Sequence, residues 1–244
     1  MDREKVIMVT GGSKRIGAEI AKYFHNRGFK VIIHFNKSVK EAESLKKNLL
    51  SKRKDSCLTI QADFFDKNSI SKALKEMLNS TDKLDVLINN ASSFFSTPIE
   101  TASREDWSNL LDTNATIPLF LTQAFKPLLD RSKGCIINIS DSQADSGISQ
   151  YSLYAAAKAA LESLTKSLSK ELAPNIRVNA IAPGIILWPE NDRVKEEIKK
   201  EIISKTALGR TGNPNDIAAA AYFLYQSTYM TGQVLKVDGG KSSI

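Results

Sequence analysis

The sequence predicts a doubly wound α/β domain, in which one parallel sheet of about seven strands carries helices on both faces. Short apolar, β-branched runs alternate along the whole chain with helix-length amphipathic stretches, and this alternation is typical of parallel sheets. The runs are apolar at nearly every position, as expected for strands buried on both faces. A chain of 244 residues is long enough for one such core, so we expect residues 1–244 to form a single domain.

Seven apolar runs are the candidate strands, and the stretches between them have helical spacing. Ile16, Ile20 and Phe24 fall on one face of a helix after the first run, and Leu161 and Leu168 do so after the fifth. Because helices follow strands in this way, we expect right-handed crossovers between parallel strands. The candidate strands are residues 6–10, 30–35, 58–62, 84–89, 134–140, 177–182 and 233–237.

One helical segment falls outside this succession. Residues 191–205 are rich in Lys and Glu, and Ile198 and Ile202 have the spacing of an amphipathic helix. We therefore expect residues 185–210 to form a substrate loop and a lid helix within the same domain.

The composition is that of an ordinary globular protein, with 42% hydrophobic and 25% charged residues. The apolar run near the N-terminus is far too short for a secretory core or a membrane span, so we expect a cytoplasmic protein with no membrane partner. Cys57 and Cys135 lie in strand-like runs, which indicates two reduced, buried thiols. We expect no metal site.

The net charge of +7 is concentrated most densely at residues 46–54. No aromatic residues interleave this basic stretch, so we interpret it as a solvated helix end and expect no nucleic-acid partner. A second interpretation stays open, because a basic surface also favours anionic ligands such as a phosphorylated cofactor or a glutamate-bearing substrate.

A glycine-rich turn follows the first candidate strand and leads directly into a helix. It reads Thr-Gly-Gly-Ser-Lys-Arg-Ile-Gly over residues 10–17. Glycines such as Gly11 and Gly17 let a backbone turn tightly and approach a pyrophosphate, while the N–H groups of the helix start point at the anion. Tight turns also use glycine for steric reasons alone, but the strand before and the helix after favour a dinucleotide site.

The end of the second candidate strand favours NADPH over NADH. Sites for NAD place an acidic residue there to accept hydrogen bonds from the ribose, whereas this chain has no acid before Glu41. Lys37 and Ser38 can donate to a 2′-phosphate, and Arg15 can reach the same anion. The alternative is that these are exposed strand-end residues without a ligand.

Tyr154 and Lys158 stand four residues apart at the start of a predicted helix, on one face. An ammonium near a phenol stabilises the phenolate and lowers the pKa of the phenol, so Tyr154 would exchange protons near neutral pH. By itself this spacing is also that of an ordinary surface pair. His25 and His34 are lone histidines for which we expect no catalytic role.

Several motifs occur together in a fixed order, and through them the chain resembles the short-chain dehydrogenase/reductase family over about residues 5 to 240. That family has a Rossmann-type fold. The motifs are the turn at 10–17, Asp63, residues 89–91, Asn114, Tyr154 with Lys158, residues 183–184 and residues 237–240.

The resemblance implies roles for individual residues. Asp63 would hold the adenine, Lys158 would also hold the nicotinamide ribose, and Asn114 would order a proton-relay water beside Lys158. The residues expected to bind the cofactor are Gly11, Arg15, Ile16, Gly17, His34, Asn36, Lys37, Ser38, Asp63, Phe64, Asn90, Ala91, Tyr154, Lys158, Pro183 and Gly184.

Asp141 is a departure from the ketone-reducing members of that family, which carry a serine thirteen residues before the tyrosine. A serine hydroxyl donates to a carbonyl oxygen, whereas an ionised carboxylate repels the oxyanion that forms as hydride arrives. Reduction of a ring C=N bond instead needs a proton at nitrogen, which an acid paired with Tyr154 can relay. The alternative is that Asp141 only caps a turn and that Ser140 or Ser142 is the hydroxyl donor.

Within the family, the chain looks most like a pteridine reductase. Those enzymes have Asp at the place of Asp141, and residues 89–98 resemble their segment in which a serine contacts the ligand and a phenylalanine stacks on the pterin. Phe94 would be that stacking residue, although core packing is the alternative for any single aromatic. The resemblance gives Asp141, Tyr154, Lys158 and Asn114 as catalytic residues and Arg15, Ser92, Phe94, Asp141, Tyr154, Leu187 and Trp188 as substrate-binding residues.

The sequence thus predicts an NADPH-dependent reductase of a pterin or folate ring C=N bond. Two alternatives stay open: a reductase of a ketone or 3-oxoacyl substrate on the same fold, and an NADPH-binding regulator without catalysis. The resemblance also implies a homotetramer, the usual form of the family.

Overall fold

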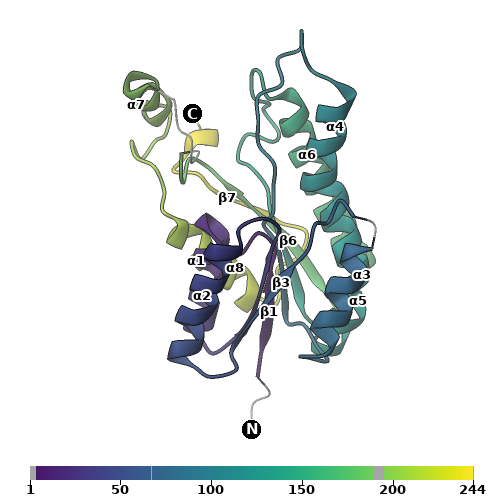
Figure 1. Cartoon of the computed structure of the whole chain (residues 1–244). Coiled ribbons are helices and arrows are strands. Elements are labelled where there is room, and N and C mark those ends of the chain that lie inside the picture. Colours follow the sequence, from purple (N-terminus) through teal and green to yellow (C-terminus); the bar gives the residue numbers. More distant parts are fainter. Residues whose placement is uncertain (1–3, 67, 189–194, 244) are drawn as a thin grey trace.

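The computed structural model describes residues 4–66, 68–188 and 195–243, and it confirms the predicted α/β fold (Figure 1). Seven parallel strands form one sheet in the order β3-β2-β1-β4-β5-β6-β7. The order reverses between β1 and β4, which is the point at which a doubly wound sheet opens a crevice for ligands.

All seven predicted strands are present, with ends that differ from the prediction by at most two residues. The interior strands are buried at almost every position, because helices cover both faces of the sheet. The strands are β1 (Val6–Val9), β2 (Lys30–Phe35), β3 (Cys57–Gln61), β4 (Val86–Asn89), β5 (Cys135–Ile139), β6 (Arg177–Pro183) and β7 (Val234–Val237).

The helices form two layers, one on each face of the sheet. In Figure 1, α1, α2 and α8 lie to the left of the strands and α3, α4, α5 and α6 lie to the right. Their bounds are α1 (Arg15–His25), α2 (Val39–Lys52), α3 (Ser69–Leu78), α4 (Arg104–Leu111), α5 (Ile117–Ser132), α6 (Ser152–Glu171) and α8 (Pro214–Gln226).

Each layer buries its own apolar core against the sheet. Phe24 of α1 packs with strand residues such as Ile7 and Val31 on one face. Phe125 of α5 packs with Met8 and Ile32 on the other face. Alternate residues of one strand therefore serve both cores, which explains why the strands are apolar throughout rather than at every second position.

Helix α7 (Glu196–Ser204) lies apart from both layers, near the C-terminal segment at the upper left of Figure 1. No residue of this helix is buried, as expected for an amphipathic helix outside the sheet succession. It begins five residues later than predicted, and positions 191–194 of the prediction lie outside the described residues. Its function as a lid stays a prediction.

A π-helical turn, η1 (Asp112–Thr116), joins α4 to α5 and was not predicted. Asn114 lies in it, and its side-chain amide donates to the carbonyl oxygens of Leu110 at 2.9 Å and Ser93 at 3.0 Å. A side chain that bonds within the helical ladder in this way widens one turn, and such turns are common at functional sites.

Within the part of the chain that is described, no helix is long and apolar enough to cross a membrane, and no group of three or more His, Cys, Asp or Glu side chains is placed to hold a metal ion.

Candidate active site

The glycine-rich turn lines a cavity of about 460 Å³ at the carboxyl ends of β1, β2 and β4. Most of the residues expected to bind the cofactor meet here, although they come from four separate segments of the chain. Those lining the cavity are Gly11, Arg15, Ile16, Gly17, His34, Asn36, Asp63, Phe64, Asn90 and Ala91.

The glycines of the turn allow its backbone to fold tightly, so that backbone N–H groups can approach a ligand closely. Gly11 has a φ of +58°, in the left-handed region that favours glycine. A Cβ on Gly17 would lie 2.6 Å from the Asn90 amide nitrogen, so only glycine fits beside Asn90. That amide donates to the carbonyl oxygens of Thr10 at 2.9 Å and Gly11 at 3.1 Å and fixes the turn. No side chain caps the start of α1, which suits a phosphate there.

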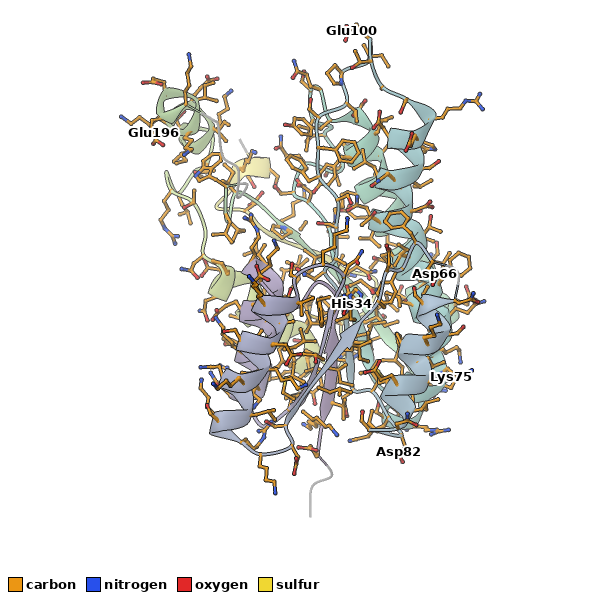
Figure 2. All side chains as sticks on the ribbon, viewed as in Figure 1. His34, Asp66, Lys75, Asp82, Glu100 and Glu196 are labelled. Atoms are coloured by element: carbon orange, nitrogen blue, oxygen red, sulfur yellow. The ribbon has the colours of Figure 1, made fainter. Side chains whose placement is uncertain are left out.

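His34 lies beneath the turn, near the middle of the molecule (Figure 2). Its Nδ1 accepts from the N–H of Gly11 at 3.3 Å, and its Nε2 bonds the carbonyl oxygen of Ala62 at 3.0 Å. Its ring also stacks on Phe64 with centroids 3.9 Å apart. Burial lowers the pKa of His34 to about 4, so a neutral ring holds the Gly11 turn in place.

Arg15 stands between the cofactor cavity and the substrate cavity described below, and it lines both. Its φ of 55° is in the left-handed region, which explains why many turns of this kind have glycine at this position. Its guanidinium donates to the carbonyl oxygens of Trp188 at 3.0 Å and Leu187 at 3.4 Å. The phosphate turn and the expected substrate loop are thereby joined.

Four residues expected to bind the cofactor line neither this cavity nor the substrate cavity. Lys37 is exposed and Ser38 partly exposed between β2 and α2, beyond Asn36. Lys158 is buried on α6, and Pro183 is buried at the end of β6. Asn36 is the residue of this strand end that reaches the cavity wall.

Tyr154 and Asp141 are in direct contact. The phenol of Tyr154, on the first turn of α6, donates to Asp141 Oδ2 at 3.0 Å, and Asp141 Oδ1 accepts from the N–H of Gln143 at 2.9 Å. Asp141 follows β5 by two residues, so the strand end and the helix start bring the pair together. The pairing that the sequence suggested is therefore present.

We predicted that the Lys158 ammonium lowers the pKa of the Tyr154 phenol, and for this arrangement that prediction is wrong. Burial, and then the carboxylate of Asp141, raise the pKa of Tyr154 well above its ordinary value. The Lys158 ammonium instead donates to the carbonyl oxygen of Ile139 at 2.8 Å and lies 5.8 Å from the centroid of the Tyr154 ring. Burial lowers the pKa of Lys158 to about 8, against the charges of Asp141 and Glu162, which raise it.

Asn114 is buried behind these residues, and its amide oxygen has no hydrogen-bond partner among the described residues. A buried acceptor without a partner is a place that suits an ordered water. The arrangement therefore fits the water that the resemblance implies beside Asn114.

A second cavity, of about 660 Å³, lies beside Tyr154 and Asp141, and we call it the substrate cavity. The expected substrate-binding residues all line it, namely Arg15, Ser92, Phe94, Asp141, Tyr154, Leu187 and Trp188. Lys158 and Asn114 do not, since both are buried behind the wall.

The aromatic residues of this cavity are stacked on each other. The Phe94 ring lies parallel to that of Tyr151, with centroids 4.6 Å apart, and edge-on to Tyr154 at 4.8 Å. Half of Phe94 is exposed, so its role is not core packing. Tyr151 was not among the predicted site residues, although an aromatic residue one turn before Tyr154 was a usable signal.

The two neighbouring serines differ in their surroundings. Ser140 donates to Glu162 at 2.7 Å. The hydroxyl of Ser142 is buried, has no hydrogen-bond partner among the described residues and lies in the wall of the substrate cavity. Ser142 is therefore the remaining candidate for an alternative hydroxyl donor.

Comparison with known proteins gives full-length matches. Residues 11–242 match the family described as enoyl-(acyl carrier protein) reductase. The chain is 36% identical over 240 residues to a 3-oxoacyl-[acyl-carrier-protein] reductase of Chlamydia muridarum, which covers 97% of this chain and 96% of that protein. It is 33% identical over 244 residues to the reductase of that name from Staphylococcus aureus strain N315, covering 98% and 99%. The Aquifex aeolicus reductase of that name is 34% identical over 240 residues, covering 97% and 96%.

Proposed function

The chain belongs to the short-chain dehydrogenase/reductase family, and on that premise we propose that it reduces a pterin ring C=N bond with NADPH, giving the tetrahydro form of a dihydropterin or dihydrofolate. The observation that carries this proposal is the contact of the Tyr154 phenol with Asp141 Oδ2 at 3.0 Å in the wall of the substrate cavity. A carboxylate stands there in place of the serine of ketone reductases.

Family membership implies a nicotinamide dinucleotide, and the residues around the glycine-rich turn fit one. Gly11 takes a left-handed φ of +58° and Gly17 packs closely against Asn90, so the turn is tight, and the start of α1 carries no side-chain cap. Lys37 and Ser38, with no acid beside them, support NADPH as the cofactor. When bound, NADPH supplies the hydride that the substrate carbon accepts.

Tyr154 supplies the proton for the ring nitrogen. Because its pKa is raised, the phenol holds its proton at neutral pH until the nitrogen becomes more basic as hydride arrives at carbon. The Asp141 carboxylate accepts the hydrogen bond of the phenol, and it stabilises positive charge on the ring nitrogen where protonation runs ahead of hydride transfer. Hydride on carbon and a proton on nitrogen complete the reduction, and a proton from solvent restores the phenol.

The same carboxylate opposes ketone reduction. Two like unit charges about 4 Å apart repel by about 4 kcal/mol at an effective dielectric constant of about 20, which corresponds to about a thousandfold in rate. An oxyanion bonded to Tyr154 would lie within this range of Asp141, whereas a protonated imine would be attracted to it.

A second candidate function is the reduction of a 3-oxoacyl substrate, and the comparisons favour it over the pterin. The relatives described above are named 3-oxoacyl reductases, and they match the chain over almost its whole length. Within the site, the Ser142 hydroxyl supports this candidate, because it is buried in the cavity wall without a partner and can donate to a carbonyl oxygen.

A panel of substrates separates these functions. Oxidation of NADPH is followed with dihydrobiopterin, dihydrofolate and dihydromonapterin, and in parallel with an acetoacetyl thioester. We expect kcat/KM for at least one pterin to exceed that for the thioester by about a thousandfold, the ratio that the charge of Asp141 implies. The opposite ranking would replace the pterin proposal by the 3-oxoacyl one, and no turnover of any substrate would support a binding protein.

Two variants give an independent check. In a 3-oxoacyl reductase that uses Ser142 as hydroxyl donor, Ser142→Ala lowers turnover about a hundredfold, whereas in a pterin reductase the same change leaves kcat nearly unaltered. For the cofactor, we expect kcat/KM with NADPH to exceed that with NADH at least about a hundredfold, and Lys37→Asp to reduce this ratio mainly through the KM for NADPH.

A further inference from the structure

A third cavity, of about 600 Å³, adjoins the substrate cavity on the side of the C-terminal segment. The two cavities share Ser142, Gln143 and Lys241 in their walls, so they adjoin at these three residues. We call it the lysine cavity. Its wall consists of Ser142, Gln143, Asp145, Ser146, Lys205, Lys236, Lys241 and Ser242.

The lysine cavity contains three ammonium groups and a single carboxylate. That carboxylate, Asp145, already pairs with Lys236 at 3.0 Å. Lys205 pairs at 2.8 Å with Glu201, which does not line the cavity. The positive charge of the wall is therefore only partly compensated.

Lys241 is the cation at the junction of the two cavities. Its ammonium donates to the side-chain oxygen of Gln143 at 2.6 Å, a neutral partner, and none of the ion pairs among the described residues includes it. Burial lowers its pKa, although Asp141 and Asp238 act in the opposite direction from further away. A partly buried cation without a carboxylate in contact is stabilised when an anion binds beside it.

We propose that the lysine cavity is a subsite for an acidic tail of the substrate, a carboxylate or phosphate, and that Lys241 is its principal ligand. The reacting end of the molecule would lie beside Tyr154, and the tail would cross the shared wall of Gln143 and Lys241. The substrate class is thus a heterocycle with an anionic tail, such as a glutamate-bearing dihydropterin. The identity of the reacting end as a pterin rests on the proposed function. The anion subsite rests on the lysine cavity alone.

Pairs of substrates that differ in tail charge test the subsite. Dihydrofolate, whose tail ends in glutamate, is compared with dihydrobiopterin, whose tail is neutral. We define the tail preference as kcat/KM for the anionic member divided by that for the neutral member. A ratio is used because Lys241 also acts on Asp141, which affects both substrates alike.

We expect Lys241→Met to lower the tail preference about tenfold, mainly by raising the KM of the anionic substrate. The separate variant Lys241→Arg keeps the charge and should keep the wild-type preference. Added salt should lower the preference of the wild type and have little effect on that of Lys241→Met. The matched control is Lys75→Met, because Lys75 is an exposed lysine on α3, to the right of the sheet and on the other side of the molecule from α7 (Figure 2). It should keep the wild-type preference.

A second pair makes failure of the subsite distinguishable from failure of the proposed function. Acetoacetyl-coenzyme A has phosphates in its tail, whereas acetoacetyl-N-acetylcysteamine has a neutral one. If the protein reduces only thioesters, the pterin proposal falls, and the tail preference within this pair tests the lysine cavity. If Lys241→Met keeps the wild-type preference in whichever pair is turned over, the anion subsite is wrong.

Discussion

Asp141 is the single residue at which the two candidate substrates demand opposite chemistry. In the pterin mechanism its carboxylate holds the Tyr154 phenol and stabilises positive charge on nitrogen, and in ketone reduction the same charge is unfavourable. We expect Asp141→Ser to lower kcat for dihydropterin about a hundredfold or more, the usual scale for a positioned acid–base group. Steady-state kinetics with dihydrobiopterin measures this.

The same variant should gain activity toward an acetoacetyl thioester, because serine donates to a carbonyl oxygen and the repulsive charge is gone. Asp130→Ser is the matched control: Asp130 lies on α5, is ion-paired with Lys126 at 2.6 Å, and lines none of the three cavities. If Asp141→Ser turns over dihydropterin at the wild-type rate, Asp141 has only a structural role in its turn.

Lys158 should give the enzyme an alkaline limit. Burial favours its neutral amine and lowers its pKa to about 8, so the ammonium is present below that pH and is lost as pH rises through it. We expect kcat/KM for NADPH, which reports on the free enzyme, to fall above about pH 8. A pH profile over the alkaline range measures this limb.

Arginine keeps its charge to much higher pH than lysine, so kcat/KM for NADPH of Lys158→Arg should not fall above about pH 8, even if the activity of the variant is lower. If Lys158→Arg shows the same alkaline fall as the wild type, the fall belongs to another group. The bound cofactor adds negative charge nearby, so we expect the limb in kcat at higher pH than in kcat/KM.

Single residues of the site were predictable where they belong to a contiguous motif. The turn at 10–17 and the spacing of Tyr154 and Lys158 could be found in the sequence, because each motif is a few residues long. The stacking of Phe94 on Tyr151 and the junction of Gln143 with Lys241 could not, since the chain brings these residues together only through the tertiary fold. The raised pKa of Tyr154 is likewise a consequence of burial, which spacing does not reveal.

At the scale of elements, strands were easier to predict than helix junctions. A strand buried on both faces is apolar throughout, so its run stands out from the flanking turns. The π-helical turn η1 gave no such signal, because it depends on the bond of Asn114 to Ser93, a residue in a distant loop. Helix α7 begins at Glu196 among the described residues, and positions 191–194 of the predicted helix lie outside them.

The seating of α1 against the loop after β4 depends on Gly17. Because a Cβ there would overlap the carbonyl oxygen of Gly11 and lie 2.6 Å from the Asn90 amide nitrogen, Gly17→Ala must move the helix start, the turn at Gly11 or Asn90. Overpacking of this kind costs about 1–3 kcal/mol, and the displaced helix start also loses its alignment with the cofactor phosphates. We expect a lower Tm and a Kd for NADPH that is raised about tenfold or more.

Gly28→Ala is the matched control for this helix. Gly28 follows α1 with a φ of +90°, and a Cβ there would meet only the tip of Arg53 at 3.9 Å. The substitution strains the backbone and lowers the Tm without disturbing the turn. Thermal melts should therefore show a lower Tm for both variants, whereas NADPH titrations should show weaker binding for Gly17→Ala only. Equal NADPH affinities would show that the turn and Asn90 tolerate the added methyl group.

At the scale of the whole molecule, several segments expose large apolar side chains, and two of these surfaces combine residues from neighbouring elements. Trp107 of α4 and Phe120 of α5 lie on one helix layer, with 38% and 48% of their surface exposed. Phe223 of α8 is 51% exposed and Tyr229, before the edge strand β7, is fully exposed. Large exposed apolar side chains are favourable to bury between subunits, and we take these two surfaces as the candidate interfaces. A four-subunit assembly with three two-fold axes uses at least two distinct interfaces, each formed by the same surface of both subunits.

We therefore expect the homotetramer that the family resemblance implies, held by an α4/α5 interface and an α8/β7 interface. Each interface alone would link two chains, so disrupting one should leave dimers joined by the other. Sedimentation of the wild type should give about four times the mass of the chain. Phe120→Asp and Tyr229→Asp should each give dimers, because a charge buried in an apolar interface is strongly unfavourable. Leu78→Asp, at an equally exposed position at the end of α3, should stay tetrameric. A monomeric wild type, or a tetramer that survives both substitutions, would show that these surfaces are not the interfaces.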